Sequence, residues 1–77
     1  MPKDIETQTF NVRSMPISGT LVSVGFAGSK SEARRLIDQG GVKLDNQVVK
    51  EDIELEFVDT PKLLQVGKRK FKNVKAK

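Results

Sequence analysis

The segment that decides the fold is SKSEARRLIDQGGVKL, residues 29–44. Its first four residues have the pattern of a capping box. In that motif the Ser29 hydroxyl accepts a hydrogen bond from the backbone N–H of Glu32, and the Glu32 carboxylate reaches back toward Ser29. The glycine pair at 40–41 is typical of a helix end, because glycine adopts the left-handed conformation that terminates helices. The segment therefore predicts a helix that starts after Ser29, stops at this pair and leads into a strand.

The predicted helix has two chemically different sides. An apolar stripe repeats at helical spacing through Ala33, Leu36 and Ile37. At about 100° per residue, four polar residues fall on one arc roughly opposite this stripe: Lys30, Ser31, Arg34 and Arg35. The helix start also presents free backbone N–H groups, which suit a phosphate. We therefore expect an apolar side on the core and a cationic side in solvent.

A shorter helix is predicted upstream, over Ser18–Phe26, with Ser18 as its cap and Gly25 as its stop. Downstream, alternating residues predict four or five short strands, with a tight turn at Asp45-Asn46 and a closing hairpin around Gly67. The predicted strands are Val42–Leu44, Gln47–Val49, Ile53–Phe57, Lys62–Val66 and Arg69–Val74. We expect Phe71 to point into the core and Lys68, Lys70 and Lys72 to share an outer face. Two helices followed by strands indicate an α+β fold.

Composition limits the function. The 77 residues leave room for one small domain, and they include neither histidine nor cysteine. The commonest general base, the thiol nucleophile and the usual zinc ligands are therefore missing, so we expect no catalytic residues, no metal and no cofactor. No apolar stretch is long enough to cross a membrane, and nothing resembles a secretory signal, so we expect a cytoplasmic protein.

Charge is segregated along the chain, whose net charge is +4. Residues 51–61 carry five acidic residues and no basic one, whereas residues 62–77 carry seven basic residues and no acidic one. This indicates a basic face suited to a polyanion and an acidic strand that faces away from it. There are four phenylalanines and no tyrosine or tryptophan. Because all four look like core or arm residues, we expect recognition through phosphates, 2′-hydroxyls and RNA shape rather than base stacking.

Residues 29–44, together with Leu21–Ala27 before them, closely resemble the RNA-binding domain named after small-subunit ribosomal protein S-four, also called the αL motif. The ending at Leu63–Phe71, with its Gly-Lys-Arg-Lys-Phe run, resembles the last hairpin of the copy at the C-terminus of bacterial tyrosyl-tRNA synthetases. The resemblance covers roughly residues 16–74. It implies two α-helices packed on a small, mostly antiparallel sheet. One departure is that Asp45-Asn46 replaces the family's common Asn-Gly turn.

The resemblance also implies a role. In that family the domain grips tRNA(Tyr) outside the active site, around the long variable arm and adjoining stem. The parent synthetase would be a homodimeric tyrosine–tRNA ligase, and this domain alone a non-catalytic monomer. Carried onto matching positions, the resemblance assigns RNA contacts to Lys30, Ser31, Arg34, Arg35, Lys43, Lys68, Arg69 and Lys70.

Two other functions stay open at this point. The chain could be a free-standing S-four-like binder of ribosomal or other structured RNA. It could also be a protein-interaction or dimerisation module whose basic face meets an acidic partner. In all of these cases we expect residues 1–15 to form a linker or loosely docked arm and residues 16–77 to form the domain.

Overall fold

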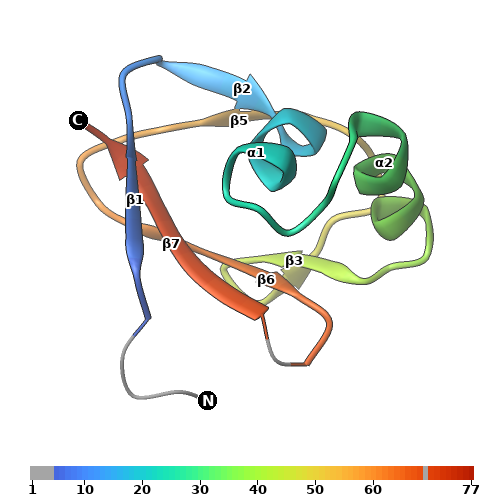
Figure 1. Cartoon of the computed structure of the whole chain (residues 1–77). Coiled ribbons are helices and arrows are strands. Elements are labelled where there is room, and N and C mark those ends of the chain that lie inside the picture. Colours follow the sequence, from blue (N-terminus) through green and yellow to red (C-terminus); the bar gives the residue numbers. More distant parts are fainter. Residues whose placement is uncertain (1–4, 69) are drawn as a thin grey trace.

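The computed structural model describes residues 5–68 and 70–77. Two helices, α1 (Ile17–Ser23) and α2 (Lys30–Asp38), pack on one side of a five-stranded sheet (Figure 1). A second sheet has two strands. The strands, in chain order, are β1 (Thr7–Phe10), β2 (Ser14–Pro16), β3 (Val42–Leu44), β4 (Gln47–Val48), β5 (Glu54–Glu56), β6 (Lys62–Val66) and β7 (Lys70–Ala76).

The main sheet is ordered β1-β7-β6-β3-β4, and only the β1–β7 pair is parallel. Strands β2 and β5 form the separate antiparallel sheet. The predicted α+β class with a mostly antiparallel sheet is confirmed. The predicted Ile53–Phe57 strand exists in shortened form as β5, but it pairs with β2 rather than joining the main sheet.

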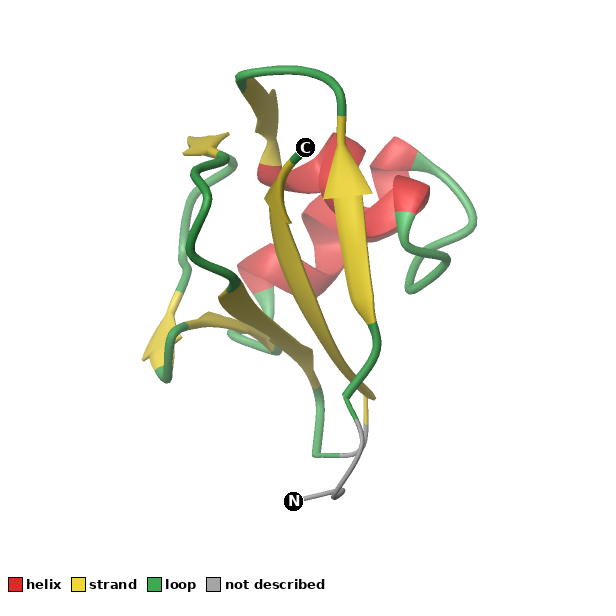
Figure 2. Cartoon of the chain, turned by 90° about the vertical axis from the view of Figure 1, so that its left-hand side faces the viewer, coloured by secondary structure: helices red, strands yellow, loops and turns green. Residues whose placement is uncertain are grey.

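The core lies between the main sheet and the helices. Val42, Leu64 and Val74 are fully buried on the helix-facing side of β3, β6 and β7, where they belong to one apolar cluster with residues of α1 and α2. Burying each such side chain contributes about 1.5–3 kcal/mol. The strands lie in front of the helices in Figure 2, so both helices cover the same side of the sheet. We call the opposite side the outer face.

The glycines predicted to end the helices do so. Gly25 and Gly40 follow α1 and α2 with φ of 84° and 72°. After α2, the N–H of Gly40 donates to the Ile37 carbonyl and that of Gly41 to the Leu36 carbonyl, both at 3.0 Å. This pair of bonds satisfies carbonyls that the last helical turn would otherwise leave open. The Asp45-Asn46 turn is also confirmed, with φ of 51° and 69°.

The predicted capping box is half confirmed. Ser29 Oγ accepts from the Glu32 N–H at 3.2 Å, as expected. The Glu32 carboxylate, however, accepts from the N–H of Gly28, at 3.2 Å, and not from that of Ser29. The glutamate thus fastens the loop before α2 rather than the cap residue itself.

The start of α1 differs from the prediction. Pro16, not Ser18, occupies the N-cap position, and it makes no side-chain cap bond. Ser18 lies inside the first turn and is buried. Its hydroxyl and its N–H both donate to the carboxylate of Asp52, 34 residues away in the sequence. Local sequence could suggest a serine cap but could not reveal this distant partner.

The predicted linker or arm over residues 1–15 is partly built into the fold. Strand β1 pairs in parallel with β7, and Phe10 is buried, stacked on Phe57 with ring centroids 4.4 Å apart. Residues 1–4 lie outside the described part of the chain. The expectation of a loosely docked segment is therefore wrong for β1 and for Ser14 and Met15, which pair in β2; the domain boundary itself stays a prediction.

Phe71 lies on the outer face, which corrects the prediction that it points into the core. The fully buried residue of β7 is Val74, and alternation places Lys70 and Lys72 on the same side as Val74. Lys72 has a side chain only 17% exposed, with Nζ 3.5 Å from a Glu6 carboxylate oxygen. Its aliphatic stem lies along the apolar layer while the charge reaches an acid at the edge. The predicted alternation is right, but its two sides are exchanged.

Candidate nucleic-acid interface

The exposed side of α2 presents the four residues expected there. Lys30, Ser31, Arg34 and Arg35 are all exposed, whereas Ala33 and Ile37 are buried on the opposite side. Ser31 and Arg35 line one shallow depression of about 450 Å³, together with Ser29, Glu32 and Leu36. The helix therefore offers a hydroxyl and a guanidinium side by side, which is the chemistry that phosphate oxygens accept.

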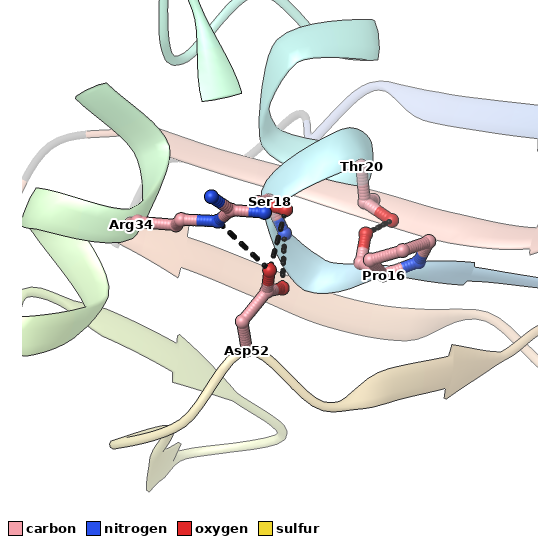
Figure 3. A network of polar contacts seen from close by, with 5 residues as sticks. All are labelled: Pro16, Ser18, Thr20, Arg34 and Asp52. Carbon is pink, nitrogen blue, oxygen red and sulfur yellow. Dashed lines mark hydrogen bonds and ion pairs between the residues drawn. The ribbon is translucent and has the colours of Figure 1, made fainter. Parts of the chain in front are cut away.

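Arg34 has an acidic partner that the sequence did not indicate. Its Nε lies 3.5 Å from Asp52 Oδ2 (Figure 3). The Arg34 side chain nevertheless stays 64% exposed, compared with 24% for Asp52. An exposed pair of this kind contributes only about 0–1 kcal/mol. The contact therefore matters more for where the guanidinium lies than for stability.

Asp52 also holds the start of α1. Its Oδ1 accepts from the Ser18 N–H at 2.9 Å, and its Oδ2 accepts from the Ser18 hydroxyl at 2.7 Å. The N–H of Ile17 donates to the Ile53 carbonyl at 2.9 Å. A carboxylate at this end of a helix satisfies free N–H groups and favours the positive end of the helix dipole. Asp52, in the segment before β5, thus caps α1 in place of Pro16. Through Arg34 it also links α1 to α2.

This network sets the direction of the Asp52 pKa. Burial raises the pKa, but the hydrogen bonds from Ser18 and the nearby Arg34 guanidinium lower it more, so the net pKa lies below the ordinary value of 3.8. Because the folded-state pKa is depressed, the ionised carboxylate stabilises the fold at any pH above the unfolded value. This contribution is lost as pH falls through the folded-state pKa.

We therefore expect wild-type stability to fall more steeply than that of Asp52→Asn as pH drops below about 3.8, because asparagine does not titrate. Denaturant unfolding at pH 7, 4 and 3 measures this difference. Parallel pH profiles for the two proteins would contradict the assigned role of the carboxylate.

The β6–β7 turn meets the C-terminal end of α2. The N–H of Gly67 donates to the Gly41 carbonyl at 2.9 Å, and Val66 pairs with Val42. Lys68 and Lys70 are exposed at this turn, and Lys70 shares the helix side of the sheet with Val66. Both α2 and the turn lie at the right of Figure 1. The turn that carries these lysines is therefore joined directly to the loop that follows α2. Arg69 lies outside the described residues.

Lys43 is not brought to this surface. It pairs with Val48 and Gln65, between the helix-facing Val42 and Leu44, and so lies on the outer face. Apart from Arg69, the predicted contact residues thus divide into two groups: one on α2 and the β6–β7 turn, and the other, Lys43 alone, on the outer face. We call the first group, on α2 and the β6–β7 turn, the basic surface: Lys30, Ser31, Arg34, Arg35, Lys68 and Lys70.

The acidic segment does not face entirely away from the basic surface, which corrects a second expectation. Glu54 does lie apart, and its carboxylate accepts from the Ser14 hydroxyl at 3.0 Å. Asp52, however, contacts Arg34 directly. Sequence reasoning missed Asp52 because its partners lie 18 and 34 residues away, where no helical or strand period connects them. A segment rich in acids gives no signal about which of them turns inward.

Two features are absent from residues 5–68 and 70–77. No helix there is long and apolar enough to cross a membrane. No group of three or more aspartate, glutamate, histidine or cysteine side chains there could hold a metal ion.

Comparison with known proteins gives one family. The model of the S4 domain family matches residues 19–57. The chain is 38% identical to a tyrosine–tRNA ligase of Chlorobium luteolum over 91% of this chain and 18% of the ligase. It is 43% identical to that of Moorella thermoacetica over 92% of this chain and 17% of the ligase. The enzyme of Thermotoga maritima is 52% identical over 66% and 13%.

The chain therefore spans less than a fifth of the length of these relatives. The matched residues 19–57 include most of α1, all of α2 and the chain through β5, so they contain Arg34 and Asp52 but not Ser18. The S-four-like resemblance is confirmed: the chain belongs to the S4 domain family, a family of RNA-binding domains.

Proposed function

We propose that this domain binds tRNA(Tyr) as a non-catalytic part of a cytoplasmic, homodimeric tyrosyl-tRNA synthetase. It would grip the variable arm and adjoining stem through phosphate and shape contacts. The observation that supports the proposal is the contact between the β6–β7 turn and the end of α2, since it joins two cation-bearing segments that are distant in the sequence. The similarity to tyrosine–tRNA ligases over most of this chain supports tRNA(Tyr) as the RNA.

The basic surface suits a phosphate backbone better than a base edge. Its described side chains are lysines, arginines and one serine, all of which donate hydrogen bonds to phosphate oxygens. Neither α2 nor the β6–β7 turn places an aromatic ring beside them within the described residues. Arg34 is also held by Asp52, so less side-chain freedom is lost when it meets a phosphate.

A salt titration tests the proposal. With about five phosphate contacts, the logarithm of the association constant should fall by about four units per tenfold rise in salt. The isolated domain should bind with a Kd in the micromolar range or weaker, about −8 kcal/mol or less in magnitude. Labelled tRNA(Tyr) is titrated at two salt concentrations, and a tRNA with a short variable arm serves as the control.

The outcomes separate the alternatives. Tighter binding of tRNA(Tyr) than of the control tRNA supports the proposal. Equal binding of both, with a ribosomal RNA fragment bound more tightly, favours a free-standing binder of other structured RNA. Salt-insensitive binding, or none, would count against an RNA function for the basic surface, and a dimer in sedimentation without RNA would then favour an interaction module.

A further inference from the structure

The outer face of the main sheet carries its own set of groups. Strand alternation and register place on it nine described residues: Thr7, Thr9, Lys43, Val48, Leu63, Gln65, Phe71, Asn73 and Lys75. Both helices pack on the other side, so no described helix covers these residues. This face is thus separate from the basic surface.

Phe71 is the only phenylalanine on this face. Phe10 and Phe57 are buried and stacked on each other, and Phe26 packs against the core. Phe71 is a half-buried residue of β7, and Gln65 lies directly across from it on the neighbouring strand β6. An aromatic ring on the helix-free face of a sheet is a kind of platform on which proteins stack single-stranded bases.

The charged residues that the described strands place on this face beside Phe71 are both lysines. Lys43 lies in the same row, beyond Gln65, and Lys75 lies four residues along β7. With strands about 4.8 Å apart, Lys43 starts about 10 Å from Phe71, a distance that the lysine side chain can shorten toward a neighbouring phosphate. Asp45, in the turn after β3, is an acid at the edge of this face, and its Oδ1 already accepts from the Leu63 N–H at 3.0 Å.

We propose that the outer face binds an unpaired RNA nucleotide, with its base stacked on Phe71 and its flanking phosphates held by Lys43 and Lys75. The inference rests on the proposed RNA-binding function and adds a second contact surface to it. The occupant follows from charge complementarity, because the charged residues of this face are lysines, its other polar residues are amides and threonines, and Val48 and Leu63 are its only apolar residues besides Phe71 among the nine. A protein partner would instead meet a broad apolar patch or charges of both signs. Gln65 Nε2 already donates to the Gly67 carbonyl at 2.9 Å, which leaves Gln65 Oε1 and the Asn73 amide to bond the stacked base.

A single tryptophan reports on this site directly. The chain contains no tryptophan or tyrosine, so Phe71→Trp provides the only strong fluorophore. We expect a single-stranded oligouridylate to quench its emission on binding, because a stacked base lies against the indole ring. Inorganic polyphosphate, which has charge but no base, should leave the emission nearly unchanged.

Two further variants complete the design. Val12→Trp places the probe at a residue that is 46% exposed and outside the outer face, and it should show no saturable quenching. Phe71→Leu keeps an apolar side chain but removes the aromatic face. Its Kd for labelled oligouridylate should be about five- to 100-fold higher than that of the wild-type chain. A thermal melt checks that Phe71→Leu remains folded.

Three results would overturn the inference. The first is unchanged Phe71→Trp emission at oligouridylate concentrations at which labelled oligouridylate saturates the chain. The second is equal quenching of Val12→Trp, and the third is unchanged affinity of Phe71→Leu. If these occur while tRNA(Tyr) still binds with a steep salt dependence, the outer-face site fails and the proposed function stands. If the wild-type chain binds no RNA at all, both fail.

Discussion

Replacing Asp52 by alanine is expected to lower the free energy of unfolding by about 2–3 kcal/mol. The variant removes the carboxylate that accepts from the Ser18 N–H and the Ser18 hydroxyl, and Ser18 is only 1% exposed. A buried donor that loses its partner costs about 1–3 kcal/mol. The pair with Arg34 adds little, because the Arg34 side chain is 64% exposed. For a domain of this size, the melting temperature should fall by about 10–20 °C.

Matched variants separate this effect from a general loss of negative charge. Glu51→Ala removes the neighbouring exposed acid and should change stability by less than about 0.5 kcal/mol. Asp52→Asn keeps an oxygen that can accept from Ser18 and should recover part of the loss. Thermal melts and denaturant unfolding measure all three variants. An Asp52→Ala protein as stable as Glu51→Ala would show that Asp52 does not hold α1.

Removing the three cations of α2 should weaken tRNA binding strongly while leaving the fold intact. The variant Lys30→Ala/Arg34→Ala/Arg35→Ala deletes exposed charges from one helix side and disturbs no buried residue. Each phosphate contact contributes roughly one unit of salt slope, which corresponds to about tenfold in affinity near 0.1 M salt. The expected loss is therefore about 100- to 1000-fold, with a salt slope shallower by about three units.

A control with the same charge change comes from the other end of the β6–β7 hairpin. Lys62 pairs with Val74 there, the Lys77 N–H donates to the Phe10 carbonyl, and the Arg13 carbonyl accepts from Phe57. The variant Arg13→Ala/Lys62→Ala/Lys77→Ala should retain affinity to within about tenfold. Equal losses in both triple variants would mean that net charge, rather than the basic surface, governs binding. Binding is measured by titration of labelled tRNA.

Arg34 links these two expectations. Asp52 binds both the buried Ser18 and the exposed Arg34, so one carboxylate stabilises α1 and orients a cation of the basic surface. Asp52→Asn should therefore weaken tRNA binding even under conditions in which the variant remains folded, as measured by the same tRNA titration. The size of that effect depends on Arg34 itself, because in an Arg34→Ala background the carboxylate no longer has a cation to orient.

The sequence predicted the elements with strong local signals. The helix after Ser29 is set by its cap, its apolar stripe and Gly40, all within about a dozen residues, and the structure has it as α2. The Asp45-Asn46 turn depends on two residues that tolerate positive φ, and it also formed as expected. Such features follow from neighbouring residues and need no knowledge of the tertiary fold.

The errors arose where long-range contacts decide. The pairing of β1 with β7 joins the two ends of the chain, and nothing within Thr7–Phe10 indicates a parallel partner. Phe71 followed the predicted alternation, but which side faces the core depends on where α1 and α2 pack. The link from Asp52 to Ser18 spans 34 residues. For the candidate site, the exposed cations of α2 could be predicted from the sequence. The position of Lys43 on the outer face, away from these cations, could not.

The most direct test of the account is a map of backbone amide shifts in the ¹⁵N-labelled chain during titration with tRNA(Tyr). Because the basic surface joins α2 to the β6–β7 turn, the largest changes should fall on Lys30–Arg35 and on the turn that follows Gly67. Phe71 and its neighbours should respond separately when unpaired RNA is used. Changes concentrated on β2 and β5, with α2 unaffected, would contradict the account.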